Sequence, residues 1–136
     1  MRKLMTALVF ASLAMAGGAV SAKPTLAERG EARLAKMLEG REAGEPVSCI
    51  PNMPTPNLTV IDRTALVYGS GSVIYVNRTQ DPRWISQNNI LVSKPTNASQ
   101  LCKMDSVYTM DRSTHMRGGA VMLEDFVPYK RIKGSK

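Results

Sequence analysis

The sequence predicts a mainly β fold of the α+β class, with one N-terminal helix and a small antiparallel barrel or sandwich of about six or seven strands. Three observations support this prediction. First, β-branched and aromatic residues are concentrated in short segments separated by glycine and polar turns, at 57–62, 64–68 and 73–77. Second, only the stretch 26–39 has the composition of a helix. Third, Cys49 and Cys102 bracket most of the expected strands.

The first 22 residues are predicted to be an export signal peptide. Arg2 and Lys3 form a positive n-region, residues 4–16 are apolar and uncharged, and residues 20–22 provide a small-residue cleavage site. The apolar stretch is shorter than the roughly 20 residues that cross a bilayer, although an uncleaved anchor helix is the alternative. Cleavage after residue 22 would leave 114 residues, which is enough for one domain. After cleavage we expect the protein not to be an integral membrane protein.

The two cysteines, Cys49 and Cys102, are best interpreted as one structural disulfide of an exported domain. The chain-entropy model predicts that closing this loop would contribute roughly 4 kcal/mol to stability. Two free thiols or a redox pair are the alternatives, but the C-x-x-C spacing typical of redox catalysis is absent. We therefore expect a protein of the bacterial periplasm or exterior.

The charge balance is moderately basic. The formal net charge is +7, or +5 without Arg2 and Lys3. This balance favours weak contact with anionic surfaces and does not bear on the fold. Because exported proteins rarely meet nucleic acid, we expect no nucleic-acid partner; anionic glycans, lipid headgroups or an acidic protein fit better.

Residues 23–45 are predicted to form an amphipathic helix and a linker. Thr25 and Glu28 have the spacing of a capping box, and Gly40 is a natural helix end. The apolar stripe recurs every four residues, at Leu26, Gly30, Leu34 and Leu38. The glycine in this stripe weakens the helix unless it permits close approach to another surface. We expect the helix to cover its own sheet, with docking to a partner or membrane as the alternative.

Residues 46–129 are predicted to be the antiparallel β-domain. Residues 66–68 and 73–76 are apolar at consecutive positions, which indicates strands covered on both faces. The cover would be the helix, the other half of a closed barrel, or a second copy of the protein. Residues 69–72 form the turn between these two strands.

The C-terminal part is predicted to contain further strands. Residues 90–93 have the composition of another strand, and Gly118 and Gly119 are expected to form the turn of a closing hairpin. Residues 130–136, with four basic residues in seven, are expected to form a flexible tail.

Seven short motifs along the chain form a set: PVSCI (46–50), VIDxTA (60–65), VY (67–68), YVN (75–77), ILV (90–92), QLC (100–102) and FVPY (126–129). This set resembles a family of small exported proteobacterial proteins of unknown function. The resemblance covers nearly the whole mature chain and implies an export signal and one compact domain, with no catalytic residues to carry over. A second likeness, to periplasmic inhibitors of lysozyme, rests on a Ser/Gly turn followed by tyrosine at 70–75.

No catalytic residue, metal ligand or cofactor site is predicted. His115 is the single histidine, so a His-rich metal site is excluded. No G-x-S-x-G elbow is present, and the glycine-containing turn lacks the pattern of a phosphate-binding loop. Carboxylates that could pair as acid and base more plausibly mark turns and strand ends: Asp62, Asp81, Asp105, Asp111 and Asp125.

Possible binding residues fall in two groups. Ser70, Ser72 and Tyr75 surround the hairpin turn, while Arg78, Arg83 and Trp84 could provide a basic surface with an aromatic platform. The leading hypothesis is an exported, disulfide-stabilised, non-catalytic domain of the cell envelope that binds an unknown envelope ligand or protein. The alternatives are an inhibitor of a cell-wall hydrolase, which would insert the turn at 69–72, and a small hydrolase.

Overall fold

The computed structural model describes residues 22–52 and 57–134, and the predicted export signal lies outside the described residues apart from its last position. The described part is mainly β with one α-helix and the disulfide Cys49–Cys102, which confirms the predicted fold class. Its helical elements are α1 (Leu26–Leu38) and the short 3-10 helix η1 (Pro82–Trp84). Its strands are β1 (Arg41–Ala43), β2 (Cys49–Pro51), β3 (Leu58–Ile61), β4 (Ala65–Tyr68), β5 (Val73–Asn77), β6 (Asn89–Lys94), β7 (Gln100–Cys102), β8 (Ser106–Asp111), β9 (Arg117–Val121) and β10 (Val127–Arg131).

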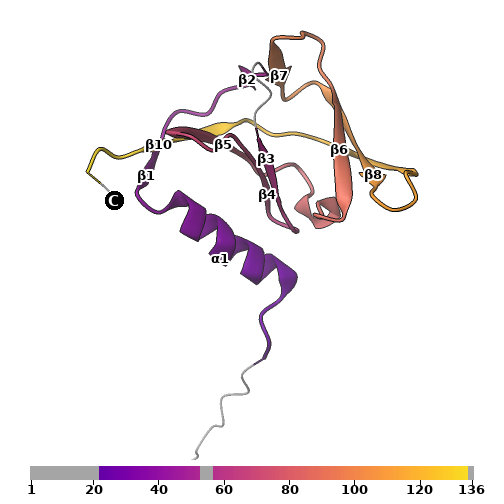
Figure 1. The fold of residues 1–136 in the computed structure, drawn as a ribbon, viewed down its shortest axis with the longest axis horizontal. Helices are drawn as coiled ribbons and strands as arrows, with labels where there is room; N and C mark the ends of the chain where they lie inside the picture. Colours follow the sequence, from indigo (N-terminus) through magenta and orange to yellow (C-terminus); the bar gives the residue numbers. More distant parts are fainter. Residues whose placement is uncertain (1–21, 53–56, 135–136) are drawn as a thin grey trace, which may run out of the picture.

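These strands form three antiparallel sheets within the described residues. The five-stranded sheet has the order β1-β10-β5-β4-β3, the three-stranded sheet has the order β6-β8-β9, and β2 pairs with β7. Figure 1 shows α1 on one side of the five-stranded sheet and β6 and β8 on the other, so the elements form layers and not a closed barrel. The strands outnumber the six or seven expected, in part because β1, only three residues long, lies in the predicted linker.

Helix α1 begins and packs as its sequence predicts. The main-chain N–H of Thr25 donates to the Glu28 carboxylate at 2.6 Å, and the Glu28 N–H donates to Thr25 Oγ1 at 3.2 Å, which completes the capping box. Leu34 is buried against the five-stranded sheet. A Cβ added to Gly30 would lie 1.9 Å from Oγ1 of Thr64. The helix therefore approaches the sheet so closely that only glycine fits at position 30.

The five-stranded sheet is covered on both faces by this same chain. The face under α1 carries the buried residues Ile61, Ala65, Val67, Ile74 and Val76. The opposite face forms a second core with residues of the other two sheets and the connecting segments: Ile50, Leu66, Tyr68, Ile85, Leu101, Val107, Val121, Leu123 and Phe126. The apolar runs of β4 and β5 thus lie between two layers, as their lack of alternation predicts.

The closing hairpin differs from its prediction. Gly118 and Gly119 do not form a turn; they lie within β9, opposite the single residue Thr109 of β8, and produce a β-bulge. The chain turns at 111–116 instead, where the Asp111 carboxylate accepts the N–H groups of the residues two and three positions further on. An aspartate can close a turn in this way without any glycine.

The linker and the tail are also shorter than predicted. Within the linker, β1 pairs with β10, with Arg41 opposite Arg131. Lys130 and Arg131 therefore belong to a strand and not to a flexible tail. Strand pairing uses main-chain hydrogen bonds and depends little on side-chain composition. The basic residues Lys130 and Arg131 can therefore pair with β1 although they have no hydrophobic pattern. The predicted β4–β5 hairpin is confirmed, with Gly69 at φ +92° in its turn.

Candidate binding surface on the three-stranded sheet

The predicted residues of the hairpin turn are divided between the surface and the core. Ser70 and Ser72 are exposed in the turn, whereas Tyr75 is half-buried and packs against the core between the sheets. The turn is fixed by Arg41, whose guanidinium donates to the carbonyl oxygens of Gly71 at 3.0 Å and Ser72 at 3.2 Å. The turn is thus an exposed loop that hydrogen bonds keep ordered, while Tyr75 contributes to packing of the core.

The predicted basic and aromatic residues contact acidic side chains in the described structure. Arg78 pairs with Glu31 of α1, and Arg83 pairs with Asp81 at 2.8 Å. The hydrogen bond from the Arg83 side chain holds the pKa of Asp81 at about 2, well below its ordinary value. Trp84 is 69% exposed, and its indole N–H donates to the same carboxylate at 3.1 Å. Arg78 thus contacts α1, whereas Arg83 and Trp84 share the Asp81 carboxylate at the start of η1.

The carboxylates considered for acid–base chemistry hold turns and loops. Hydrogen bonds, led by the one from the Ser113 hydroxyl, keep the pKa of Asp111 well below its ordinary value. The Lys103 ammonium, 2.8 Å from the Asp125 carboxylate, likewise lowers the pKa of Asp125. His115 is exposed in the β8–β9 turn. In the part of the chain that the structure describes, no group of three or more His, Cys, Asp or Glu side chains could hold a metal ion.

A different surface emerges from the register of the three-stranded sheet. One face points to the core and carries Leu91, Val107 and Val121. Residues that alternate with these, and that pair across the strands, must share the opposite face. We call this opposite face the outer face; it consists of Ile90, Val92 and Lys94 of β6, Ser106, Tyr108 and Met110 of β8, and Arg117 and Ala120 of β9.

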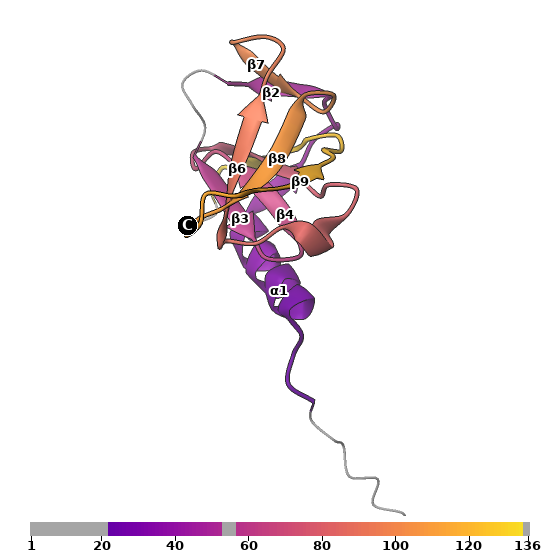
Figure 2. The same ribbon diagram turned by 90° about the vertical axis from the view of Figure 1, so that its right-hand side faces the viewer.

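The outer face is apolar in its centre and cationic at two of its corners. Its four large apolar side chains are half-buried: Ile90, Val92, Tyr108 and Met110. The Arg117 guanidinium lies 4.2 Å from the centre of the Tyr108 ring, a cation–π contact. Among the described residues neither Lys94 nor Arg117 forms an ion pair. In Figure 2, β6, β8 and β9 lie at the front of the molecule, with the five-stranded sheet and α1 behind them.

A pocket of about 340 Å³ opens on the outer face beside β9. Tyr108, Arg117 and Ala120 line it together with the turn before β8 and the segment after β9. Two methionines at its rim are exposed, Met104 at 87% and Met122 at 58%. Exposed thioethers are flexible and polarisable, so they adapt to different apolar partners. The pocket thus combines an adaptable apolar rim with four charged side chains, the cations Lys103 and Arg117 and the carboxylates Asp105 and Glu124.

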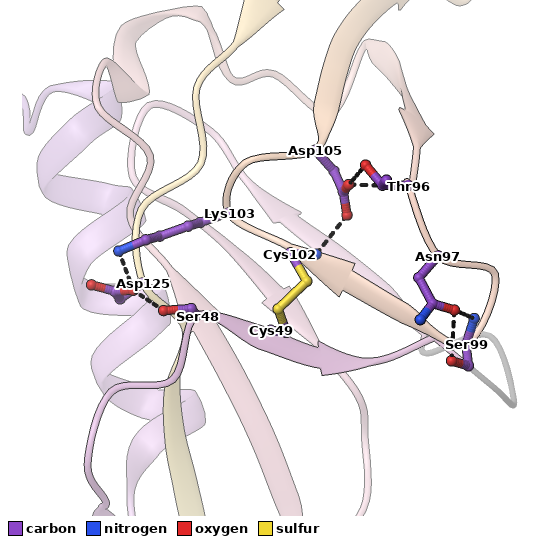
Figure 3. The surroundings of a disulfide bond; sticks show 9 residues. All are labelled: Ser48, Cys49, Thr96, Asn97, Ser99, Cys102, Lys103, Asp105 and Asp125. Atoms are coloured by element: carbon purple, nitrogen blue, oxygen red, sulfur yellow. Dashed lines mark hydrogen bonds and ion pairs between the residues drawn. A yellow bond between two sulfur atoms is a disulfide. The ribbon is translucent and has the colours of Figure 1, made fainter.

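The disulfide and a buried carboxylate fix the wall of this pocket (Figure 3). Cys49 and Cys102 stand opposite each other in the β2–β7 ribbon, directly before the turn that lines the pocket. Asp105, only 7% exposed, accepts the N–H of Cys102 at 2.6 Å and both the N–H and the hydroxyl of Thr96 at 2.8 Å. Burial opposes ionisation of Asp105, but these hydrogen bonds prevail and lower its pKa.

Sequence reasoning missed the outer face, although one signal pointed to it. Residues 90–92 are apolar at consecutive positions, as are the strands that are covered on both faces. Composition alone did not assign alternate residues to opposite faces of β6. The pairing of β6 with β8, which brings Ile90 beside Met110 and Val92 beside Tyr108, was needed to recognise a continuous apolar surface.

Comparisons with family models, curated proteins and solved structures found no match to the chain. Over the described residues, no helix has both the length and the hydropathy required to cross a bilayer.

Proposed function

We propose that the protein is an exported, non-catalytic binding domain of the bacterial cell envelope, which uses the outer face and its pocket to bind a partner protein. The observation that carries this proposal is the apolar centre of the outer face, which no other sheet and no helix of the described chain covers. Contiguous apolar surface of this kind marks interaction sites in soluble proteins. The disulfide supports function in an oxidising compartment, the periplasm or the exterior.

Four of the candidate carboxylates are poorly suited to act as general acids. A general acid at neutral pH needs a raised pKa, whereas the pKa values of Asp81, Asp105, Asp111 and Asp125 are all lowered. Each of these carboxylates also accepts hydrogen bonds from neighbouring groups. A panel of glycosidase, esterase and peptidase substrates provides the test. Turnover that is lost on His115→Ala, or on replacement of one of these aspartates, would overturn the proposal in favour of a small hydrolase.

Site-specific photo-crosslinking in living cells tests the binding surface. A photoreactive amino acid is placed at Ser106 or Ala120, which are exposed on the outer face, and at Ala32, which is exposed on α1. We expect discrete crosslinked adducts from both outer-face positions and none from Ala32. Equal adducts from all three positions, or no adducts at all, would contradict the proposed surface.

The hairpin turn favours a second candidate function, the inhibition of a cell-wall hydrolase. The Arg41 guanidinium orders the turn by donating to the carbonyl oxygens of Gly71 and Ser72. An inhibitory loop gains affinity when it is ordered before binding. Lysozyme activity in the presence of excess protein tests this function, with Gly71→Val as the loop variant. Inhibition that is abolished by Gly71→Val would support it; lysozyme activity unchanged by the protein would eliminate it.

A further inference from the structure

We infer that the partner contributes an extended acidic segment, which pairs with the free edge of β9 as a fourth strand of the three-stranded sheet. This inference rests on the proposed function and specifies its ligand. It depends on three features of the sheet: an open edge, a glycine that the fold does not require, and a surface charge of one sign.

The edge of β9 is open to another strand. Among the described residues, β9 has a neighbouring strand on one side only in the order β6-β8-β9, and its first four residues are exposed. Main-chain groups on such an edge pair readily with an added strand. The opposite edge, β6, is less suited, because every position carries a side chain and the strand ends in Lys94; an edge lysine disfavours pairing.

The two glycines of β9 have different structural roles. A Cβ added to Gly118 would lie 2.3 Å from Oγ1 of Thr109, so the fold itself requires this glycine. A Cβ added to Gly119 would meet nothing within 4 Å, and its φ lies outside the left-handed region. A glycine inside a strand weakens the strand, and it often marks a place where another backbone approaches closely. At Gly119 no such backbone belongs to the described chain, which leaves room for a partner's.

The charge of the surface specifies an acidic segment. Arg117 and Lys94 are the charged residues of the outer face, which carries no carboxylate, and the whole chain has a formal net charge of +7. A strand added beside β9 would place alternate side chains on the outer face, next to Arg117 and Ala120. Acidic side chains would complement the cation, and apolar ones would meet the rim formed by Met104 and Met122.

Peptide selection tests the chemistry of the partner. The oxidised protein, purified from cells that express the full chain, is used to select from a random library of linear peptides displayed on phage. We expect enriched sequences that alternate acidic and apolar residues. A synthetic peptide of the enriched sequence should bind at least about tenfold more weakly when alternate peptide nitrogens are N-methylated, because a strand donates hydrogen bonds through them. Binding should also weaken as salt concentration rises.

A second valine variant provides the comparison. Gly119→Val should weaken binding of the selected peptide at least about tenfold, whereas Ala32→Val, at an exposed position of α1, should leave it unchanged. Equal binding by both variants would show that the bulge merely protects the edge, and it would overturn the inference. Enrichment of neutral or basic peptides, or a failure to enrich any peptide, would also overturn the inference. Unchanged binding of the N-methylated peptide would overturn it too, and this measurement does not depend on how a variant folds. Crosslinking from Ser106 and Ala120 would still stand in those cases, so failure of this inference is distinguishable from failure of the proposed function.

Discussion

The two larger sheets use similar apolar strands in different ways. In the five-stranded sheet, the consecutive apolar residues of β4 lie between α1 on one face and the inter-sheet core on the other. In the three-stranded sheet, Leu91 of β6 contacts that same core, but its neighbours Ile90 and Val92 lie on the outer face. The difference indicates that an apolar run does not by itself ensure cover on both faces, because the described part of the chain covers only the core-facing side of β6.

The largest expected effect concerns the disulfide that fixes the end of the three-stranded sheet. We expect Cys49→Ala combined with Cys102→Ala to lower the free energy of unfolding by about 4 kcal/mol, because the 53-residue loop is no longer closed in the unfolded chain. Urea denaturation measures this loss. Amide hydrogen exchange should accelerate more in β7 and β8 than in β4 and β5. Uniform acceleration would show that the two sheets do not differ in their dependence on the bridge.

The second prediction compares a covered strand position with an open one. Leu66 is fully buried in the inter-sheet core. Leu66→Ala should lower the free energy of unfolding by about 3 kcal/mol, because apolar burial is lost and a cavity remains. Val92→Ser on the outer face should lower the free energy of unfolding by less than about 1 kcal/mol, because no layer formed by the described residues covers this half-buried side chain. Thermal and urea unfolding of both variants provide the measurement. A large loss for Val92→Ser would mean that the outer face is stabilised within the protein itself.

The third prediction concerns Asp105, which ties the start of β8 to the disulfide ribbon. Asp105→Asn should lower the free energy of unfolding by about 2 kcal/mol at neutral pH, because hydrogen bonds to a charged acceptor are lost.

Carboxylates whose pKa is lowered on folding stabilise the protein above their unfolded pKa of 3.8 and lose this effect as pH falls. We therefore expect stability to decline from about pH 4 towards the folded pKa of about 2 of Asp81. Stability that falls instead between neutral pH and pH 5 would contradict this assignment.

The smallest effect sharpens the comparison at the covered face of the five-stranded sheet. Gly30→Ala should destabilise the protein by about 1–2 kcal/mol, although alanine favours helices, because the new methyl group would clash with Thr64 and with the carbonyl oxygen of Asp62. Ala32→Gly, at an exposed position of α1, provides the control and should cost up to about 1 kcal/mol from helix propensity alone. A stabilising Gly30→Ala would show that α1 does not pack tightly on the sheet.

Local chemistry made several elements predictable. The capping box at Thr25 and the turn at Gly69 each depend on residues within a few positions of one another, and each forms as expected. The predicted binding residues fared differently: Arg78 and Arg83 are held in ion pairs, and the partner of Arg78 is Glu31 of α1. No local sequence pattern predicts the contact between Arg78 and Glu31, because the two residues lie far apart in the chain.

The sequence by itself determined a mainly β chain with one capped helix and one cysteine pair, because these follow from short-range propensities and from a count of two thiols. Only the tertiary structure decided that the sheets lie in layers, that Gly118 and Gly119 belong to an edge strand, and that no other sheet or helix of the described residues covers the outer face. The physical reason is that a strand's periodicity separates its two faces but does not identify what covers each. That depends on register and on long-range pairing, which this chain establishes only when it folds.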